Sequence, residues 1–171
     1  MNSIVNCILQ TERLYLRLMT PADAHYAYEL NNDPEVIRYT GDDAFKNVQA
    51  AETFLANYKD YEKHGVGRWA VIRKEDGAWL GWCGLKYLPE TSEVDLGYRL
   101  HQRYWGMGYA TEAAKACVAN GFEKFSYPFI IGRVLMENKA SIKVLENCGL
   151  KLIAAKSFHG AEGLYYRINR P

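Results

Sequence analysis

The stretch between residues 67 and 125 constrains the fold more than any other part of the chain. Apolar and polar residues alternate with a period of two in 67–73 (GRWAVIR), 79–88 (WLGWCGLKYL) and 93–100 (EVDLGYRL), a pattern typical of β-strands. The short turns between these segments predict a consecutive antiparallel meander. A helical period follows over 106–125, so the meander runs directly into a long helix.

The rest of the chain alternates helices and strands. We expect, in order, a strand at 12–18, a helix that starts at Thr20-Pro21 and stops before Pro34, a helix at 47–63, a strand at 129–136, a helix at 138–148, and strands at 150–157 and 164–168. A meander followed by a strand–helix–strand unit gives parallel and antiparallel pairs in one sheet. The prediction is an α/β fold in a single domain over residues 1–171, with an open, twisted, mixed sheet of roughly six to seven strands and about four helices.

Charge and composition argue against several classes of protein. Lys and Arg number 21 against 20 Asp and Glu, and no basic stripe is visible, so the sequence indicates no nucleic-acid partner. No apolar run is long enough to cross a membrane, and the N-terminal MNSIVNCILQTERLYL lacks the features of an export signal, so we expect a cytoplasmic protein without a membrane role. The four cysteines and four histidines show no metal-ligand spacing, so we expect free packed thiols and no metal.

The most informative motif lies where the third strand of the meander ends. Gly106-Met107-Gly108 lets the chain turn tightly, and a long helix starts at once. The first turn of a helix has unpaired amide N–H groups at the positive end of the helix dipole, so a phosphate or pyrophosphate can bind there. A purely structural turn is the alternative from these residues alone. The motif is not a P-loop, because GxxxxGK[ST] is absent, and Thr111 replaces the third glycine of a dinucleotide fingerprint.

Residues 106–113 (GMGYATEA), after Gly97-Tyr98-Arg99-Leu100, resemble the acetyl-CoA signature of the GNAT superfamily of N-acetyltransferases, and most of all its RimJ/RimL-type branch. The superfamily pattern Q/R-x-x-G-x-G/A falls on Trp105, Gly108 and Ala110, with Trp in place of Gln or Arg, or else on Arg103, Gly106 and Gly108. The resemblance implies that backbone amides between residues 106 and 111 hold the pyrophosphate of CoA. The cofactor-binding residues that it implies in this turn are Trp105, Gly106, Met107, Gly108, Tyr109, Ala110 and Thr111.

Further segments extend the resemblance over residues 10–168. Residues 138–150 (NKASIKVLENCGL) resemble an NxxSxxVLExxGF motif, which implies that Asn138 binds the pantetheine arm and that Ser141 lies near the thiol. Residues 11–23 and 32–41 resemble the start of the same branch. The tyrosine that many relatives use as the acid for the leaving thiolate is replaced here by Leu145, which leaves Ser141 as the nearest substitute. Tyr165 and Tyr166 are weaker candidates for this role.

Transfer of an acetyl group to an amine needs a base and a donor for the oxyanion. A carboxylate near the amine can take its proton, and strand 93–100 offers Asp95 and Glu93 on one face. We favour Asp95, which occupies the acidic position of the ELGY pattern of the branch; solvated strand carboxylates are the alternative. The resemblance implies an oxyanion donor near Leu100 or Tyr98, which makes both residues cofactor contacts as well. The residues that could line an acceptor pocket are Tyr39, Trp69, Trp82, Tyr87 and His159.

These expectations combine into an acetyl-CoA-dependent N-acetyltransferase that works by direct attack of a primary amine on the thioester. The acceptor is either a protein N-terminal α-amine, as in the ribosomal-protein-acetylating relatives, or a small amine such as an amino acid, polyamine or antibiotic. A non-catalytic acyl-CoA-binding module is a further alternative, because the usual tyrosine acid is missing. A nucleotide-binding protein is disfavoured by the order of the strands. The protein would be a monomer or a homodimer.

Overall fold

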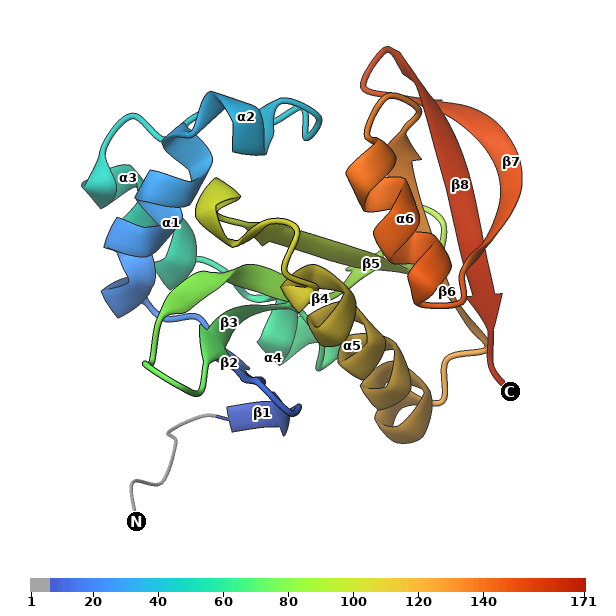
Figure 1. Ribbon diagram of the computed structural model, residues 1–171, viewed down its shortest axis with the longest axis horizontal. Helices are drawn as coiled ribbons and strands as arrows, with labels where there is room; N and C mark the ends of the chain where they lie inside the picture. Colours follow the sequence, from blue (N-terminus) through green and yellow to red (C-terminus); the bar gives the residue numbers. More distant parts are fainter. Residues whose placement is uncertain (1–6) are drawn as a thin grey trace.

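Eight strands form one sheet in the computed structural model, which describes residues 7–171 (Figure 1). Their order across the sheet is β1-β2-β3-β4-β5-β6-β8-β7, and every neighbouring pair is antiparallel except β5 and β6. The strands are β1 (Cys7–Gln10), β2 (Leu14–Leu18), β3 (Arg68–Arg73), β4 (Trp79–Leu88), β5 (Glu93–Leu100), β6 (Phe129–Leu135), β7 (Lys151–Phe158) and β8 (Ala161–Asn169). The mixed α/β sheet is confirmed, with one strand more than expected. The additional strand is β1, which is too short to show a period and pairs with β2 through an irregular register.

The helices are α1 (Ala24–Asn32), α2 (Pro34–Ile37), α3 (Val48–Ala56), α4 (Asp60–His64), α5 (Tyr109–Phe125) and α6 (Lys139–Asn147). The single helix expected at 47–63 is wrong, because α3 ends before Asn57 and α4 starts at Asp60. Two tyrosines lie at the break: the Tyr58 hydroxyl accepts a hydrogen bond from the backbone N–H of Arg68, and the Tyr61 hydroxyl donates to its carbonyl. These bonds fasten the segment to the start of β3.

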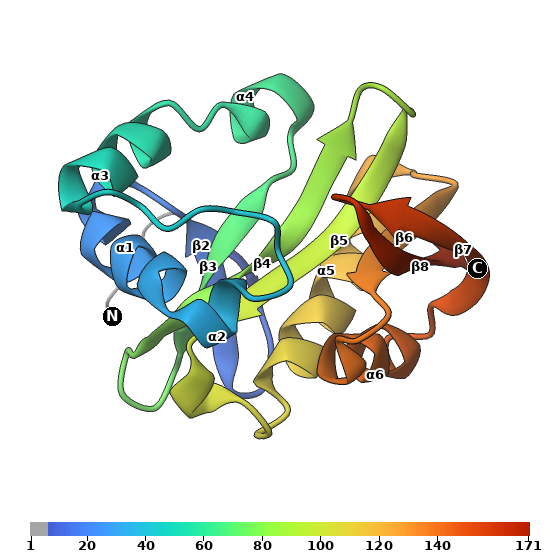
Figure 2. The same ribbon diagram turned by 90° about the horizontal axis from the view of Figure 1, so that it is seen from above.

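The two faces of the sheet are covered by different helices. On one face α5 packs over β4 and β5, and the large core there includes Leu14, Leu16, Trp69 and Val71. On the other face the neighbouring β3 residue Ile72 packs with Leu30 of α1. Figures 1 and 2 show α1 to α3 gathered on this second side of the sheet, with α5 and α6 on the opposite side. Because β3 is covered on both faces, its middle residues are all buried.

The sheet opens between β5 and β6. These parallel strands pair at a single position, Asp95 opposite Ile131, and separate beyond it (Figure 1). The wedge that they leave faces the start of α5 on one side and the start of α6 on the other. This opening positions the candidate site at the C-terminal end of β5.

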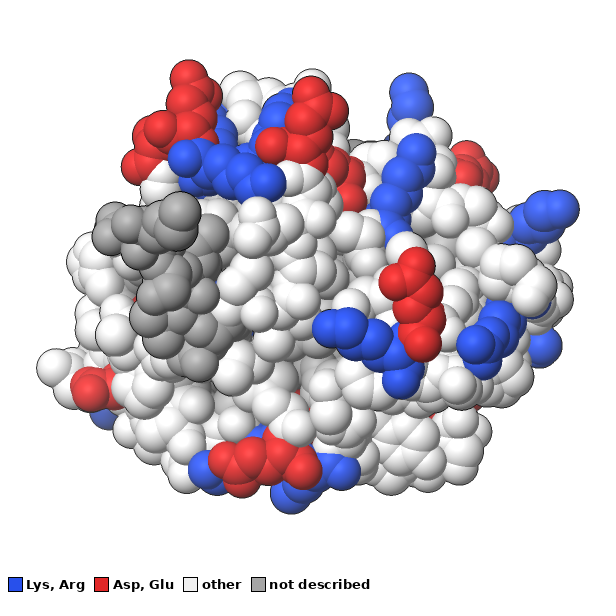
Figure 3. Space-filling view, turned by 90° about the horizontal axis from the view of Figure 1, so that it is seen from below, with Lys and Arg blue, Asp and Glu red and all other residues white. Residues whose placement is uncertain are grey.

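Two further properties bear on partners. Within residues 7–171, no helix has the length and apolar character needed to span a bilayer. On the face drawn in Figure 3, acidic and basic side chains lie in small groups of both signs, separated by uncharged surface. A cytoplasmic location and the absence of a nucleic-acid partner stay predictions.

Candidate active site

The larger of two neighbouring cavities lies in the wedge between β5 and β6. Its volume is about 610 Å³, which is in the range of small-molecule sites. The expected cofactor residues that line it are Tyr98, Leu100, Trp105, Gly106, Gly108, Tyr109, Ala110, Thr111, Asn138 and Ser141. Met107 is not among the lining residues, because its side chain is exposed and its carbonyl accepts a hydrogen bond from Nη1 of Arg13 (3.0 Å).

Two glycines with positive φ shape the turn that enters α5. Gly106 has φ +73° and Gly108, which caps the helix, has φ +80°, values that side chains with a Cβ rarely adopt. A Cβ built on Gly106 would meet nothing within 4 Å, so the space beside the backbone is open. The first amides of a helix of 17 residues therefore border the cavity with the positive end of its dipole. This arrangement suits a phosphate or pyrophosphate.

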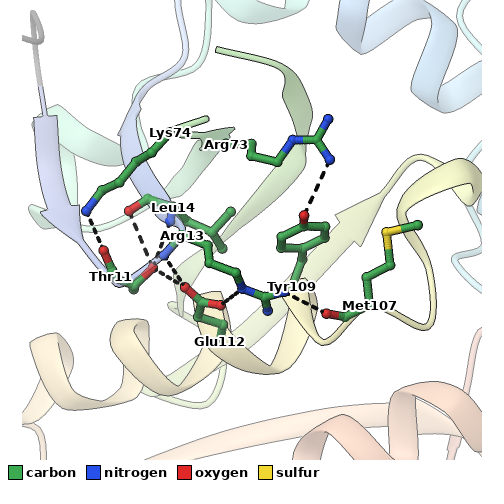
Figure 4. A network of polar contacts seen from close by, with 8 residues as sticks. All are labelled: Thr11, Arg13, Leu14, Arg73, Lys74, Met107, Tyr109 and Glu112. Carbon is green, nitrogen blue, oxygen red and sulfur yellow. Dashed lines mark hydrogen bonds and ion pairs between the residues drawn. The ribbon is translucent and has the colours of Figure 1, made fainter. Parts of the chain in front are cut away.

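A polar network fastens this turn to the start of β2 (Figure 4). Glu112, in the first turn of α5, accepts hydrogen bonds from Oγ1 of Thr11 (2.6 Å) and from N and Nε of Arg13 (2.9 and 2.7 Å). Burial works against the charged carboxylate, but the hydrogen bonds from Thr11 and Arg13 outweigh it and lower the pKa of Glu112. Because Arg13 also holds the carbonyl of Met107, the glycine turn has a fixed support.

The start of α6 forms the opposite wall. Oδ1 of Asn138 accepts a hydrogen bond from the N–H of Ser141 (3.1 Å) and caps the helix. The Tyr98 hydroxyl donates to the carbonyl of Ser141 (2.8 Å) and lies 2.8 Å from its Oγ, so it joins the two walls. Burial raises the pKa of Tyr98, which keeps its hydroxyl protonated.

Sequence reasoning missed two lysines of this wall. Lys139 and Lys143 both line the larger cavity, one helical turn apart on α6. Their spacing of four residues in a helix that starts at the cavity was the signal that could have found them. The two ammonium groups add positive charge beside the helix-terminal amides of α5.

The end of β5 presents backbone amides to the wedge. The N–H of His101 donates to the carbonyl of Leu80 on β4 (2.9 Å). Since successive amides of a strand in an antiparallel pair point to opposite sides, the N–H groups of Leu100 and Tyr98 point away from β4, toward the cavity. The carbonyl of Leu100 points the same way and accepts a hydrogen bond from Nε1 of Trp105 (2.8 Å). This geometry fits the oxyanion donor expected on this strand.

A smaller cavity of about 210 Å³ adjoins the larger one. The residues that line both cavities are Tyr39, Thr40, Tyr98, Arg99, Asn138 and Ser141. The two cavities therefore meet at the Tyr98–Ser141 pair. A molecule in one cavity could react there with a molecule in the other.

The structure separates the two candidate carboxylates. Asp95 lines the smaller cavity, is 6% exposed, and accepts hydrogen bonds from Nη2 of Arg68 (3.1 Å) and Nε of Arg133 (3.5 Å). Glu93 lines neither cavity and accepts a hydrogen bond from the Tyr165 hydroxyl. Burial, with help from this bond to Glu93, raises the pKa of Tyr165 to about 12. Only Asp95 is placed to meet a molecule in the smaller cavity.

Arginine is the main feature of the smaller cavity that sequence reasoning missed. Arg68, Arg99 and Arg133 come from three different strands and all line it. The guanidinium groups of Arg68 and Arg99 lie over the ring of Trp82, at 5.2 and 5.1 Å from its centroid. Burial lowers the pKa of Arg99, and its ion pair with Asp42 (2.6 Å) opposes this shift. No sequence spacing connects these arginines, because only the register of the sheet brings them together.

The aromatic residues proposed for an acceptor pocket divide into two groups. Tyr39, Trp82 and His159 line the smaller cavity. Trp69 instead lies in the core and is 1% exposed, and Tyr87 packs against His64 (ring centroids 4.8 Å apart). Those two placements are wrong because both side chains lie on the face of the sheet that packs on α5.

Neither Leu145 nor Tyr166 offers a proton donor to the two cavities. Leu145 is 2% exposed and contributes apolar wall to the smaller cavity. Tyr166 donates a hydrogen bond to Glu146 (3.1 Å) and lines neither cavity. In the part of the chain that the structure describes, no group of three or more His, Cys, Asp and Glu side chains could hold a metal ion.

Comparison with known proteins decides the family. A family model described as "Acetyltransferase (GNAT) domain" matches residues 13–151. The chain belongs to the GNAT acetyltransferases. It is 34% identical to the protein YkkB of Bacillus subtilis (strain 168) over 145 residues. This aligned region covers 83% of this chain and 84% of that protein. It is 33% identical over 141 residues to a Bacillus licheniformis protein named as an uncharacterized N-acetyltransferase, p20, covering 81% of this chain and 79% of the other.

Solved structures agree with this assignment. The crystal structure of a GNAT-family acetyltransferase from Bacillus anthracis superposes with a TM-score of 0.81 at 25% identity, covering 95% of this chain and 98% of that chain. This GNAT protein is thus an acetyl-CoA-dependent N-acetyltransferase with acetyl-CoA as its co-substrate. The RimJ/RimL-type branch stays a prediction, as do the roles of individual residues.

Proposed function

We propose that this enzyme transfers the acetyl group of acetyl-CoA to the primary amine of a compact small molecule held in the smaller cavity. The observation that carries this proposal is the contact above that cavity between the loop after α2 and the β7–β8 turn. A Cβ built on Gly41 would lie 3.0 Å from the ring of His159, so the two segments touch (Figure 2). A polypeptide N-terminus needs an open groove between these segments, whereas a small amine does not.

The turn at the tip of the β7–β8 hairpin holds this roof in place. His159 and Gly160 have φ values of +51° and +75°, which suit a tight two-residue hairpin turn. Residues 158 and 159 line the smaller cavity from above, opposite Tyr39 and Thr40. The volume of about 210 Å³ is also below that of sites for drug-sized ligands. Both features favour a compact acceptor over a protein N-terminus, the acceptor that the RimJ/RimL-type resemblance suggested first.

The larger cavity would hold acetyl-CoA with its thioester at the junction of the two cavities. The amides of residues 106 and 108–111 suit the pyrophosphate, and Lys139 and Lys143 are placed to neutralise phosphate charge. The side-chain amide of Asn138 borders the path between phosphates and thioester, as expected for a contact with pantetheine. The match of positive charge to the phosphates along this path supports the placement.

The chemistry then needs only groups that line one or both of the two cavities. Asp95 takes the proton of the attacking ammonium, directly or through water, and the freed amine attacks the thioester carbonyl. The N–H groups of Tyr98 and Leu100 stabilise the oxyanion. Ser141, with Tyr98 beside it, donates a hydrogen bond to the sulfur as the C–S bond breaks, and the second proton of the attacking nitrogen passes through water to the leaving thiolate. A thiol with a pKa near 8.5 leaves as the thiolate without a strong acid, so Leu145 in place of a tyrosine does not prevent the reaction.

The test follows free-thiol release from acetyl-CoA with two panels of acceptors, small primary amines and short peptides with free N-termini. Turnover with small amines, and at most trace turnover with peptides, is the expected result. Turnover with peptides alone would replace this proposal by N-terminal acetylation. Acetyl-CoA binding without turnover in either panel would favour a non-catalytic binding module. A reaction without acceptor measures background hydrolysis and is subtracted from both panels.

A further inference from the structure

The geometry points to an acceptor that carries an anionic group, a carboxylate in the first place, close to the amine that is acetylated. Arg133 and Arg68 would bind the anion while Asp95 meets the amine. This inference rests on the proposed function, because it concerns the acceptor of the same small cavity. It names the chemical class of the substrate: compact amino acids and related zwitterions, not polyamines or other polycations.

The charges that line the smaller cavity are unbalanced. Three guanidinium groups face it, from Arg68, Arg99 and Arg133, and Asp95 is the one carboxylate among the lining residues that the structure describes. Both terminal nitrogens of Arg99 already have partners that do not line the smaller cavity. Nη2 pairs with Asp42 (2.6 Å), and Nη1 donates to Oδ1 of Asn31 (2.7 Å). Asp95 must then serve two arginines. One positive charge is left without a carboxylate of its own.

Arg133 holds that surplus charge. Its contact with Asp95 is the longest of the ion pairs at this cavity, with 3.5 Å between Nε and Oδ1. Between residues 7 and 171, its terminal nitrogens Nη1 and Nη2 have no hydrogen-bond partner. The side chain is 39% exposed and its guanidinium lies 5.9 Å from the ring centroid of Phe158, at the roof of the cavity. Two forked donors are therefore available to a carboxylate, a geometry that guanidinium groups match well.

Arg68 is fixed beside it. Nη1 donates to the carbonyls of Gly84 (2.7 Å) and Asp95 (3.1 Å), and Nη2 donates to the Asp95 carboxylate. The guanidinium lies against Gly97, where a Cβ would come within 2.5 Å of its Cζ. The absence of a side chain at Gly97 thus lets a buried charge lie against β5. This charge is held in place before any acceptor binds.

The pattern is complementary to a zwitterion. A carboxylate flanked by two guanidinium groups can receive an ammonium and an anion that are close together in one molecule. A polycation would instead place added positive charge against three arginines in a partly buried cavity, where repulsion is weakly screened. The same argument disfavours amines that lack any acid group, because they leave the surplus charge of Arg133 unmatched.

The experiment compares amino acids with their C-terminal amides, in matched pairs such as alanine and alaninamide, or phenylalanine and phenylalaninamide, with spermidine as a polycation. The readout is kcat/KM for thiol release at saturating acetyl-CoA. The amine of an amide loses its proton more easily, so this difference works against the expected result. We expect each acid to exceed its amide about tenfold or more, with spermidine the poorest acceptor.

Variants of Arg133 test whether this residue causes the preference for acids over amides. Arg133→Gln should lower kcat/KM for acids about ten to a hundred times more than for amides, while Arg133→Lys should restore part of the preference. The matched control is Arg167→Gln on the neighbouring strand β8, whose guanidinium lies over Phe129 and outside both cavities. This control should keep the wild-type preference.

Two results would overturn the inference in different ways. Amides or spermidine used as well as acids, or an Arg133→Gln variant that lowers both series equally, would refute the anion-binding role and leave small-amine acetylation standing. Turnover of no amino acid, no amide, no spermidine and no other small primary amine, with acetyl-CoA still bound, would refute the proposed function and this inference with it.

Discussion

The two cavities that meet at Tyr98 and Ser141 are built in different ways. The larger one is made from three stretches of chain, 35–40, 98–111 and 137–147, and the groups proposed to hold the pyrophosphate are backbone amides at the start of a helix. The smaller one draws side chains from β3, β4, β5 and β6, the loop after α2 and the β7–β8 turn. We therefore expect the larger cavity to be sensitive to backbone conformation and the smaller one to the identity of single side chains.

The largest effect should come from the one carboxylate of the smaller cavity. Asp95→Asn removes the proposed base, so kcat/KM for the amine should fall about 10²–10⁴-fold while the affinity for acetyl-CoA changes little. The pH profile is the decisive measurement, because the variant should then need an amine already deprotonated by the solvent. Unchanged kcat/KM across pH would remove Asp95 as the base.

The matched control is Glu93→Gln, two residues away on the same strand. Glu93 bonds to Tyr165 and lies outside both cavities, so its amide variant should keep near-normal kcat/KM. A melting curve for each variant is needed as well, because Asp95→Asn leaves Arg68 without its carboxylate and should lower the melting temperature. Equal loss of activity in both variants would contradict the distinction between the two carboxylates.

A second change tests whether the larger cavity depends on backbone conformation. Gly108→Val forces a β-branched residue to φ +80° at the start of α5, which strains the turn by about 1–3 kcal/mol. If the turn relaxes to relieve this strain, its amides move, and KM for acetyl-CoA should rise about tenfold to a hundredfold. The amine KM should change little.

Gly77→Val is the matched control for this change. Gly77 has φ +72° in the turn between β3 and β4, and a Cβ there meets nothing within 4 Å. It should lower the melting temperature about as much as Gly108→Val but leave KM for acetyl-CoA unchanged. A similar rise of KM in both variants would show that loss of stability alone accounts for the effect.

The same contrast explains which parts could be predicted from the sequence. The sequence could predict that the glycine turn, Asn138 and Ser141 belong to one site, because each lies in a short local pattern that also sets the local backbone. The strands at 79–88 and 93–100 match the structure for the same reason, since their period of two is local. Arg68 and Arg133 are 65 positions apart in the numbering, and only sheet register brings both to Asp95. No local signal marks them, and the same holds for Trp69, whose face of the sheet depends on where α5 packs.

A smaller effect is expected at Gly97, which lines the smaller cavity. Gly97→Ala places a Cβ about where the Arg68 guanidinium lies, so Arg68 must move away from Asp95. Because the obstacle is the end of a flexible side chain, the fold should survive. We expect kcat/KM for the amine to fall about tenfold, the usual cost of one displaced charged hydrogen bond, with KM for acetyl-CoA unchanged. A rise in the acetyl-CoA KM alone would assign Gly97 to the other cavity.

The smallest effect concerns the network that supports the glycine turn. The pKa of Glu112 is lowered in the folded protein from its usual value of 4.5. A carboxyl group with a lowered folded-state pKa stabilises the fold above its unfolded pKa, and this stabilisation is lost as the pH falls through the folded value. Glu112→Gln should therefore lower the melting temperature by about 1–4 °C at pH 7, and the difference from wild type should shrink below about pH 4.5. A difference that stays constant down to pH 3 would mean that the charge of Glu112 does not stabilise the turn, and that its contacts with Thr11 and Arg13 act as ordinary hydrogen bonds.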